Sequence, residues 1–548
     1  LDAETYEIKT MLYALFAATG CLLLIACLNI ANLLVARSAS RRREAAIRTA
    51  LGGTRATLVR ERVTESILLC FAGGALGLLF ARIALTWLLH QRTDLPRAES
   101  IHLDLTAILF CIALAALCGI GAGLVPALVD DEQQVLRTLQ ESSRSVSGGR
   151  GSISLRRALL SVEVALTVVL LVGAGLFLRS FQKLRAVDIG VPTANVLHVS
   201  IHLTDAAYKD GQPKLTFIEQ LLERVRALPR VRSAGISTCL PGTGHCSDDA
   251  LTIPELPPPP KGQFWDASVR WVDPGFFKAM EIPLLRGRYF SPDERLTRRK
   301  YVIVSESFVR KFLPSTDPLG KHVVDSNNGE LNEKPEPSME IIGVVGDVRE
   351  FPNREPRPTV YYPLYGGLVG NLELSVRTTG DPLSMAMPVQ RVVAQLDPTL
   401  PVSDVLSLDQ MIGKYTAQAS FDAILLLVFA VLSLILAAVG LFGVLSYIVA
   451  QRTGEIGIRI ALGAQREQVM RLMLADGLRP AILGLVLGLV ASAATTRLIR
   501  SQLYGTQPLD PLVLAIVAAA LLAVAAAACL VPAWRASRLD PMEALRTE

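Results

Sequence analysis

Residues 44–53 read E-A-A-I-R-T-A-L-G-G and residues 455–464 read E-I-G-I-R-I-A-L-G-A, so a shift of 411 positions superposes the two segments. In each segment a glutamate precedes an arginine by four residues, which on a helix forms an ion pair, and a glycine is placed to end that helix. We therefore expect two equivalent short helices, each turning into a second helix at an elbow. The matched positions are Glu44, Ile47, Arg48, Leu51 and Gly52 in the first segment and Glu455, Ile458, Arg459, Leu462 and Gly463 in the second.

The similarity continues on the C-terminal side of both segments. Gly73 and Gly77 superpose on Gly484 and Gly488 with the same shift, and small residues at this helical spacing allow helices to pack closely in lipid. With a slightly shorter shift, Asp104 matches Asp510 and Val125-Pro126-Ala127 matches Val531-Pro532-Ala533. The sequence therefore predicts a duplicated unit.

The composition places this duplication in a membrane. Hydrophobic residues make up 51% of the chain and charged residues 19%, a balance too apolar for a soluble protein of this length. A helix needs about 20 apolar residues to cross about 30 Å of hydrocarbon. The stretches that meet this requirement are about 11–36, 64–89, 104–128, 158–178, 419–449, 476–499 and 511–533. The predicted fold class is a polytopic α-helical membrane protein with about seven transmembrane helices.

The arginines predict the orientation of these helices. Eight arginines lie from Arg37 to Arg62, whereas only Arg92 and Arg97 lie between the second and third spans, so the first group is expected in the cytoplasm. Alternation places all the remaining basic clusters inside as well, with the N-terminus of the chain outside and its C-terminus cytoplasmic. The location in the bacterial plasma (inner) membrane is implied by the family resemblance described below. This bias accounts for the net charge of +5, which therefore does not indicate nucleic-acid binding.

The same alternation places residues 179–418 outside the cytoplasm, where they are long enough to form a domain. Strand-like runs such as 196–203 and 339–345 alternate with helical patterns such as 215–228 and 382–396, which indicates an α+β fold. The sequence has no G-x-S-x-G motif, no H-E-x-x-H motif and no zinc-like ligand spacing. We therefore expect no enzyme active site, no metal site and no cofactor.

The cysteines divide into two groups. Six of the eight lie in apolar runs, where cysteine acts as a small hydrophobic residue. Cys239 and Cys246 lie instead in the polar domain that is expected outside, where disulfides persist. The sequence leaves both a disulfide between them and two free thiols open.

The repeated elbows have two interpretations. Basic residues near an anionic lipid surface contribute roughly 1 kcal/mol each, but lipid binding does not require the order E-x-x-I-R-x-A-L-G twice, so docking of a cytoplasmic partner is favoured. ATP would have to be bound by another chain. The only Gly-Lys pairs, Gly320-Lys321 and Gly413-Lys414, are not followed by the serine or threonine of a phosphate-binding loop.

Three further motifs join the elbows: L-L-I-A-C-L-N-I-A-N-L-L-V-A-R at residues 23–37, V-D-P-G-F-F-K-A-M at 272–280 and I-I-G-V-V-G-D-V at 341–348. Together they resemble the FtsX-like, MacB-type permeases of ABC transporters, and within that family the duplicated orphan permeases of bacteria. The resemblance covers essentially the whole chain. It implies residues 1–130 as the last three helices of a first FtsX-like unit, 131–157 as a cytoplasmic linker, 158–178 as the first helix of a second unit, 179–418 as an extracytoplasmic MacB-like periplasmic core domain and 419–548 as the C-terminal three-helix domain. The upstream helix and outer domain of the first unit are not matched, and the start at Leu1 instead of Met indicates a fragment or a processed product.

The resemblance implies a permease subunit without an ATPase of its own. In such a subunit a separate cytoplasmic ABC ATPase moves the elbows, and the helices transmit this motion to the outer domain for export or extraction of a substrate. Other implied partners are membrane lipid, a periplasmic or outer-membrane protein, and a second unit in a homodimer or in a pseudo-dimer within a longer chain. The alternative is a regulatory transmembrane adaptor that activates a periplasmic cell-wall enzyme without transport.

A third hypothesis is an ion-coupled carrier, motivated by Glu163 within the fourth predicted span. A charged residue at mid-membrane costs roughly 2.5 to 3.5 kcal/mol on insertion scales and often marks function. However, Glu163 follows Arg156 and Arg157 by about two helical turns, and no second acidic residue lies mid-span to relay a proton. Structural pairing or hydration of Glu163 is therefore favoured over a carrier role.

Overall fold

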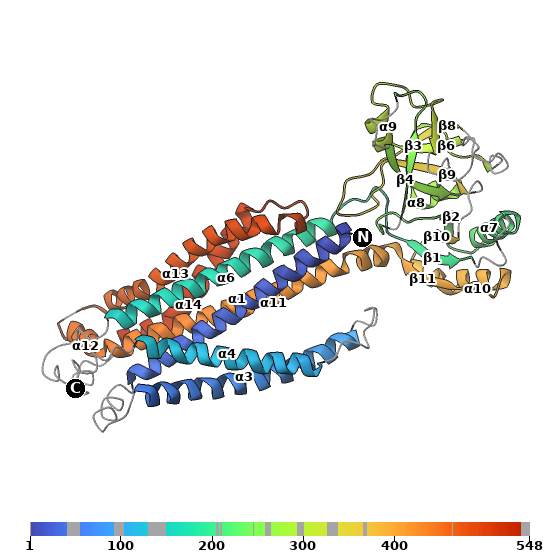
Figure 1. Cartoon of the computed structure of the whole chain (residues 1–548). Coiled ribbons are helices and arrows are strands. Elements are labelled where there is room, and N and C mark those ends of the chain that lie inside the picture. The colour runs from blue at the N-terminus through green and yellow to red at the C-terminus, as the bar shows by residue number, and fades with distance from the viewer. Residues whose placement is uncertain are drawn as a thin grey trace. The chain divides into compact units, whose positions relative to one another are not determined.

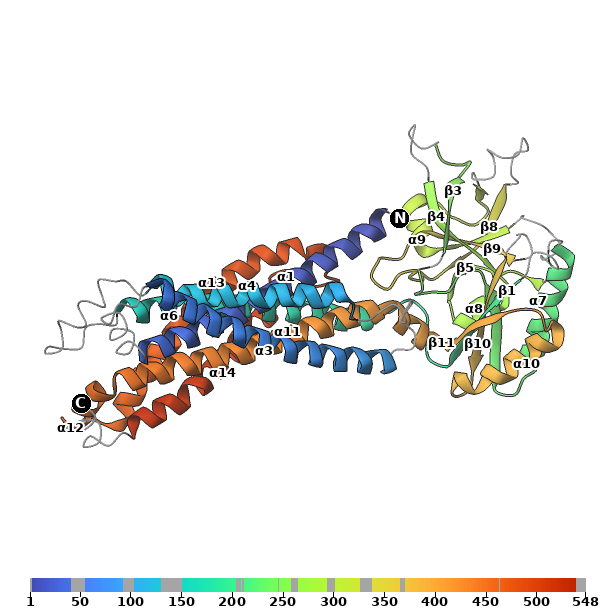
Figure 2. The ribbon, with the colours of Figure 1, turned by 60° about the horizontal axis from the view of Figure 1, so that its bottom comes forward.

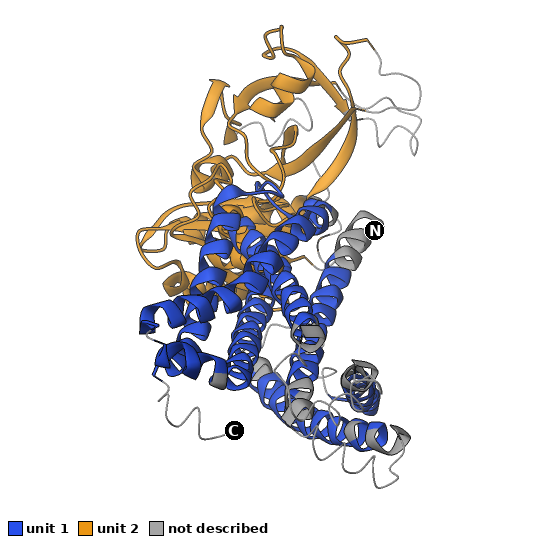
Figure 3. Cartoon of the chain, turned by 90° about the vertical axis from the view of Figure 1, so that its left-hand side faces the viewer, with its two compact units in different colours: residues 1–180, 422–548 blue, residues 181–421 orange. Residues whose placement is uncertain are grey.

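The computed structural model describes residues 2–40, 55–91, 103–129, 150–203, 208, 211–244, 246–257, 265–292, 301–325, 338–364, 370–462 and 464–538. It divides into two compact units (Figure 3). Residues 1–180 and 422–548 form the first, called the helical unit below, and residues 181–421 form the second, called the sheet unit. Each is described by itself.

The described residues of the helical unit are almost entirely helical (Figure 1). Their bounds are α1 (Asp2–Ser40), α3 (Arg55–Gln91), α4 (Leu105–Val129), α6 (Arg150–Arg185), α11 (Leu408–Gln451), α12 (Thr453–Ala461), α13 (Arg466–Leu498), the 3-10 turn η5 (Arg500–Gln502) and α14 (Pro511–Ser537). Within the described residues, six helices are long and apolar enough to cross a membrane, namely those containing Met11–Leu33, Val59–Trp87, Arg156–Arg185, Leu408–Gln451, Arg466–Arg497 and Pro511–Ser537. The apolar stretch Leu105–Gly121 of α4 is shorter than this criterion requires. The membrane fold is thus present, while the number of seven spans stays a prediction.

The duplication is visible where two helices begin. The Asp510 carboxylate accepts the backbone N–H of Leu512 at 3.1 Å, and the Asp104 carboxylate accepts that of Ala107 at 2.9 Å. Both aspartates therefore satisfy N–H groups that a helix start leaves without intrahelical partners. Two positions that match in the sequence start α14 and α4 in the same way.

The matched glycine pairs differ in their surroundings. A Cβ atom at Gly484 would lie 2.6 Å from the carbonyl oxygen of Ser161, and one at Gly488 would lie 2.6 Å from the Cβ of Val168. Both glycines therefore let α13 approach α6 closely, as expected. Among the described residues, no atom lies within 4 Å of a Cβ placed at Gly73 or Gly77. The expected close packing is thus found for the second pair and not for the first.

Among its described residues, the sheet unit contains one sheet of eleven strands with helices against it. The strands are β1 (Val196–His202), β2 (Val231–Ser237), β3 (Ser247–Thr252), β4 (Trp265–Val272), β5 (Leu284–Gly287), β6 (Tyr301–Ser305), β7 (His322–Asp325), β8 (Met339–Val345), β9 (Thr359–Pro363), β10 (Asn371–Thr378) and β11 (Val402–Ser407). Their order is β11-β1-β10-β2-β4-β3-β7-β8-β6-β9, with β5 on β8. Because β9 also pairs with β4, the last six strands of this path close into a ring. The expected α+β fold is present.

Two helical layers cover different parts of this sheet. The helices are α7 (Gly211–Arg226), α8 (Gly275–Met280), α9 (Glu306–Phe312), the turn η4 (Pro382–Met385) and α10 (Ala386–Leu396). Helices α7 and α10 lie side by side beside β1 and β10 (Figures 1 and 2), where their apolar faces share one core with those strands. Helix α9 contributes Phe308 and Phe312 to the core inside the strand ring. Helix α8 contributes Phe276 and Phe277 to a third core.

The motif at residues 272–280 is explained by packing. The fully buried Asp273 accepts the backbone N–H of Ile236 at 2.5 Å and of Gly275 at 2.9 Å, and it pairs with Arg226 at 3.0 Å. One carboxylate therefore joins β4, β2 and α7, while it also holds the start of α8. Gly275 is required here because a Cβ would lie 2.6 Å from the backbone carbonyl oxygen of Ala234.

The motif at residues 341–348 is structural in the same sense. Asp347 accepts the backbone N–H of Ser307 at 2.6 Å and pairs with Arg310 at 2.9 Å, so it fixes α9 to the end of β8. A Cβ at Gly343 would lie 2.4 Å from the carbonyl oxygen of Arg288. The contacts of these two sequence motifs therefore stabilise the fold of the sheet unit.

Candidate functional site: the α12 elbow

Helix α12 presents an exposed ridge made of matched motif residues. Glu455 and Arg459 form the expected i,i+4 ion pair, with 2.7 Å between Arg459 Nη2 and Glu455 Oε1. Beside this pair, Ile458 is 50% exposed and Leu462, directly after the helix, is 83% exposed. Two large apolar side chains next to an ion pair can form the contact surface of a partner, because exposed apolar groups flanked by charges are typical of docking sites. We call Glu455, Ile458, Arg459 and Leu462 the α12 ridge.

The opposite face of α12 packs into the helical unit. Ile456 is 2% exposed and shares a core with Val469 and Met473 of α13 and with Ala533 and Ala536 of α14. The turn after α12 is fixed by hydrogen bonds from Leu462 N to Ile458 O at 3.0 Å and from Ala464 N to Arg459 O at 2.9 Å. The elbow is therefore attached to α13 and α14 through apolar contacts.

A second attachment is ionic and converges on Asp476 of α13. This side chain is 8% exposed and lies 3.1 Å from Arg157 of α6 and 2.9 Å from Arg452, the residue that joins α11 to α12. Arg479 lies at 3.7 Å, on the same helix as Asp476. A carboxylate with low exposure is held by paired cations, since an unpaired charge there would cost several kcal/mol. Asp476 thus joins three helices at the elbow.

Arg156, next to Arg157 on α6, is also buried at this end of the helical unit. Its guanidinium carbon lies 3.7 Å from the centroid of the Tyr447 ring of α11. An arginine above an aromatic face gains from a cation–π interaction, more strongly where water is excluded. α6 and α11 are therefore held together close to the elbow by a second contact.

The structure describes only some of the docking residues that the sequence predicts. The structure brings Glu455, Ile458, Arg459 and Leu462 together on one surface. Gly463 and the matched first set, Glu44, Ile47, Arg48, Leu51 and Gly52, lie outside the described residues. Sequence reasoning missed Asp476, although the shift of 411 places it on Glu65, another acidic residue. That match was the available signal.

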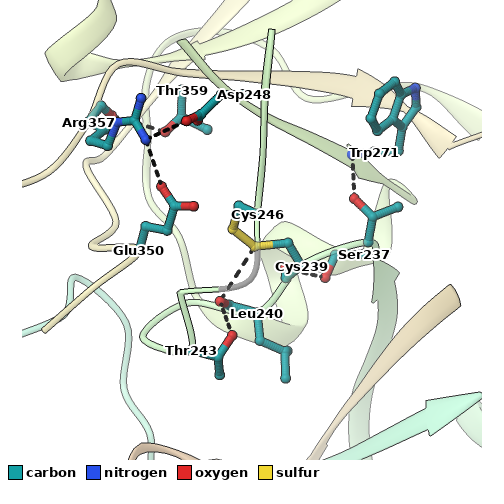
Figure 4. The surroundings of a disulfide bond; sticks show 11 residues. Ser237, Cys239, Leu240, Thr243, Cys246, Asp248, Trp271, Glu350, Arg357 and Thr359 are labelled. Atoms are coloured by element: carbon teal, nitrogen blue, oxygen red, sulfur yellow. Dashed lines mark hydrogen bonds and ion pairs between the residues drawn. A yellow bond between two sulfur atoms is a disulfide. The ribbon is translucent and has the colours of Figure 1, made fainter. Parts of the chain in front are cut away.

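The sheet unit contains a second feature, a short loop closed by a disulfide between Cys239 and Cys246 (Figure 4). Thr243 donates its hydroxyl to the carbonyl oxygen of Leu240 at 3.0 Å inside this loop. Gly242 and Gly244, both with positive φ, donate their N–H groups to the carbonyl oxygens of Arg349 and Glu350 at 2.9 and 3.0 Å. Only glycine adopts this backbone at low cost.

This loop lies against both chain segments that lead to the helical unit. A Cβ at Gly242 would lie 3.2 Å from the side chain of Ile412, in the first turns of α11, and 3.4 Å from that of Ile189, which follows α6. Arg349 N also donates to Ile189 O at 2.9 Å. The disulfide loop therefore contacts the entry and the exit of the sheet unit.

Comparison with known families agrees with these features. The sequence model described as FtsX-like permease C-terminal matches residues 16–129 and again residues 427–541. The model described as MacB-like periplasmic core domain matches residues 162–405. The duplicated match coincides with the two repeats of the helical unit, and the two models together cover most of the chain. The chain belongs to the FtsX-like, MacB-type permease family of ABC transporters.

Individual relatives show the same kinship. The chain is 27% identical over 293 residues to the macrolide export ATP-binding/permease protein MacB 2 of Aeromonas hydrophila, covering 51% of this chain and 43% of that protein. It is 26% identical over 303 residues to the uncharacterized ABC transporter permease YknZ of Bacillus subtilis, covering 52% of this chain and 70% of that protein. This permease thus spans less than half the length of MacB 2. The solved periplasmic region of MacB from Actinobacillus actinomycetemcomitans is similar at 15% identity, a TM-score of 0.27 and coverage of 41% of this chain and 94% of that chain.

Proposed function

We propose that this permease works by mechanotransmission. A separate cytoplasmic ABC ATPase binds the α12 ridge, and the movement of α12 passes along α6 and α11 to the periplasmic core domain, which acts on a substrate for export or extraction. The observation that carries this proposal is the contact of Asp476 with Arg157 and Arg452, which joins the docking helix to both of the long helices. In this proposal α12 faces the cytoplasm and the core domain lies on the other side of the membrane.

The continuity of α11 supports this route. The helix runs without a break from Leu408 to Gln451, and at roughly 1.5 Å per residue its 44 residues extend about 66 Å. Leu408 is fully buried in a core of the sheet unit, whereas Gln451 is separated from α12 by Arg452 alone. A displacement of α12 therefore reaches the core domain through one continuous helix.

The proposal extends to the first repeat by sequence. Residues Glu44, Ile47, Arg48, Leu51 and Gly52 would form a second elbow for the same ATPase, with Gly52 placed to end its helix as Gly463 is placed in the second repeat. Two elbows fit an ATPase that acts as a pair of subunits, since each repeat would receive one.

The test uses charge reversal on the ridge. We expect Arg459→Glu to reduce co-purification of the ATPase at least about tenfold, because it replaces the partner of Glu455 by a like charge at the centre of the docking surface. Leu462→Ser should act in the same direction by removing the most exposed apolar contact. The measurement is recovery of the ABC ATPase co-expressed with the permease, together with its rate of ATP hydrolysis.

Arg471→Glu is the matched control, because Arg471 is exposed on α13 outside the ridge. It carries the same charge change and should leave co-purification unchanged. Normal ATPase recovery with Arg459→Glu and Leu462→Ser would refute docking at α12. Transport and regulation are separated by a further measurement: ATP-dependent release of a substrate supports export, whereas capture of a cell-wall hydrolase by the core domain without such release supports the regulatory adaptor.

A further inference from the structure

Three helices of the helical unit meet at a buried polar contact within their membrane-spanning segments. Asn29 of α1 and Glu163 of α6 are 7% and 0% exposed. Asn29 donates its side-chain amide to Glu163 Oε1 at 2.5 Å and to the carbonyl oxygen of Leu436 of α11 at 3.1 Å. One amide therefore bonds both helices of the second repeat. The partner of Glu163 is thus an asparagine of the first repeat and neither Arg156 nor Arg157.

Gly440 of α11 makes room for this contact. A Cβ placed at Gly440 would lie 2.6 Å from Asn29 Oδ1 and 2.7 Å from Glu163 Oε2, so any larger residue would displace the pair. Glu163 also fixes its own helix locally, since its carbonyl oxygen accepts the Thr167 hydroxyl at 3.0 Å. The carboxylate therefore lies in a closely fitted position.

The two repeats carry residues of different kinds at the positions of this contact. The shift of 411 that superposes the elbows also superposes Asn29 on Gly440, and Asn32 on Gly443. One repeat thus provides amides where the other provides glycines. Asn29, Asn32, Gly440 and Gly443 also line a common cavity of about 20 Å³ together with Arg156. Around this cavity the amides of the first repeat therefore fit the glycines of the second repeat. One repeat cannot take the place of the other in this contact.

The difference between Asn29 and Gly440 determines which repeat can provide a hydrogen-bond donor to Glu163. If two second repeats from two chains met in the same way, Gly440 would take the place of Asn29 and would offer Glu163 no donor. An unpaired carboxylate inside a membrane is costly, and interhelical hydrogen bonds there stabilise the pairing of helices. We propose that Asn29 and Glu163 form a polar latch that pairs the first repeat with the second repeat of the same chain and disfavours pairing of second repeats between two chains. This inference does not depend on the proposed docking of an ATPase at α12.

Thermal unfolding tests the latch as a pair. In the full chain purified in detergent with lipid, Asn29→Ala and Glu163→Ala should each lower the melting temperature by roughly 0.5 to 1.5 °C, the expected shift for one such bond in a chain of this size. The double variant should lose less than the sum of the two, because each substitution removes the same bond. Glu163→Gln keeps an acceptor for Asn29 and should melt close to the parent. Additive losses in the double variant would overturn the latch.

Association of copies tests its specificity. Two differently tagged full chains are co-expressed, one tag is captured, and the amount of the second is measured. We expect background recovery for the parent and for Glu163→Gln, and at least threefold more for Asn29→Ala and Glu163→Ala. The matched control is Gly477→Ala, which places a methyl group about 2.7 Å from Cys529 Sγ within the second repeat and destabilises it without touching the latch.

Gly477→Ala should lower the melting temperature while recovery of the second copy stays at background. Equal recovery in Gly477→Ala and Asn29→Ala would show that general destabilisation causes association, and this would overturn the proposed specificity. Unchanged recovery in both Asn29→Ala and Glu163→Ala would overturn it as well. Because Asn29 keeps its bond to Leu436 O when Glu163 is replaced, Glu163→Ala remains informative if Asn29→Ala folds poorly.

Discussion

At the scale of single residues, Asp476 is the position on which the proposed coupling depends. It holds Arg157 and Arg452 with a side chain that is only 8% exposed, so its charge balances cations from α6 and from the α11–α12 junction. It does not belong to the α12 ridge. Docking of the ATPase and transmission of its movement should therefore be separable at this residue.

We expect Asp476→Asn to retain the ATPase on co-purification while reducing ATP-dependent activity several-fold. The amide keeps the shape of the carboxylate but removes the counter-charge of Arg157 and the nearer of the two carboxylates beside Arg452, whose other partner is Glu455. Breaking a buried pair costs roughly 3 to 5 kcal/mol, and this partly exposed one should cost less. The measurement compares ATPase recovery with ATP-dependent substrate release. Glu467→Gln, an exposed acidic residue in the first turn of α13, is the control and should change neither. Loss of ATPase recovery in Asp476→Asn would instead make it part of the docking surface.

The disulfide is a second prediction at this scale. Because Cys239 and Cys246 are bonded, alkylation of the denatured chain without reductant should modify six of the eight cysteines, and all eight after reduction. Intact mass spectrometry counts the modified thiols directly. Cys239→Ser should lower stability by roughly 2 kcal/mol, because the short loop that the bond closes becomes free in the unfolded chain. Eight modified thiols without reductant would contradict the bond.

These residues show which side-chain contacts could be predicted from the sequence. The pair Glu455–Arg459 was predictable because its members lie four positions apart on one helix. The contact of Arg157 with Asp476 joins positions 319 apart, and that of Asn29 with Glu163 joins positions 134 apart. No local periodicity indicates such partners. Such partners are determined by how the helices pack. The sequence predicts that these helices lie in the membrane but does not specify which of their faces meet.

At the scale of elements, the sequence predicts whether a segment is a helix or a strand better than it predicts where that element begins and ends. Hydropathy limits the predicted fifth span to residues 419–449, whereas α11 begins at Leu408. The additional turns are polar and project beyond the apolar stretch, so a criterion based on lipid contact does not detect them. The predicted strand at 339–345 coincides with β8, because a buried strand flanked on both sides reads as a continuous apolar run.

The antiparallel pair of β1 and β10 contains two titratable groups with opposite responses to pH. His198 Nε2 lies 3.2 Å from Glu373 Oε2. Burial is the main cause of both shifts: it lowers the pKa of His198 from 6.5 to about 4 and raises the pKa of Glu373 from 4.5 to about 7. Between these values the strand pair is therefore held by neutral side chains.

The signs of the two contributions are opposite. From pH 4.5 to 7 the folded chain keeps a proton on Glu373 that the unfolded chain has released, so the contribution of Glu373 to stability falls as the pH rises. From pH 4 to 6.5 the unfolded chain keeps a proton on His198 that the folded chain excludes, so the contribution of His198 rises with pH. In the parent chain the two trends offset each other between about pH 4.5 and 6.5.

Replacing one of these two side chains should leave only the pH dependence of stability that the other side chain causes. We expect Glu373→Gln to lose up to about 2 kcal/mol between pH 6.5 and 5, since only the unfolded His198 then takes up a proton. His198→Gln should show the reverse, with stability falling from pH 5 to 7. Thermal unfolding of the full chain at pH 5, 6 and 7 measures both slopes relative to the parent. Parallel slopes in all three proteins would show that this pair does not control the pH dependence.

At the scale of the whole molecule, the open question is on which side of the membrane each part lies. Short arginine-rich segments next to the spans determine the orientation of a membrane protein, whereas a large polar domain is translocated largely regardless of its charge. The placement of the elbows in the cytoplasm and of the core domain outside therefore derives from one physical bias. It is testable with two exposed positions on different units.

We expect a cysteine at position 285 to react with a membrane-impermeant maleimide in intact spheroplasts, and a cysteine at position 462 to react only after the membrane is permeabilised. Leu285 of β5 is 48% exposed and Leu462 is 83% exposed, so both sites are accessible to the reagent once it reaches their side. The background carries Cys239→Ser and Cys246→Ser, so that no other cysteine of the core domain can react with the maleimide. A soluble cytoplasmic protein with a free cysteine verifies that the spheroplasts are sealed. Labelling of position 462 and protection of position 285 in sealed spheroplasts would invert the topology. An ATPase in the cytoplasm could then not reach the α12 ridge, so this result would also exclude the proposed coupling.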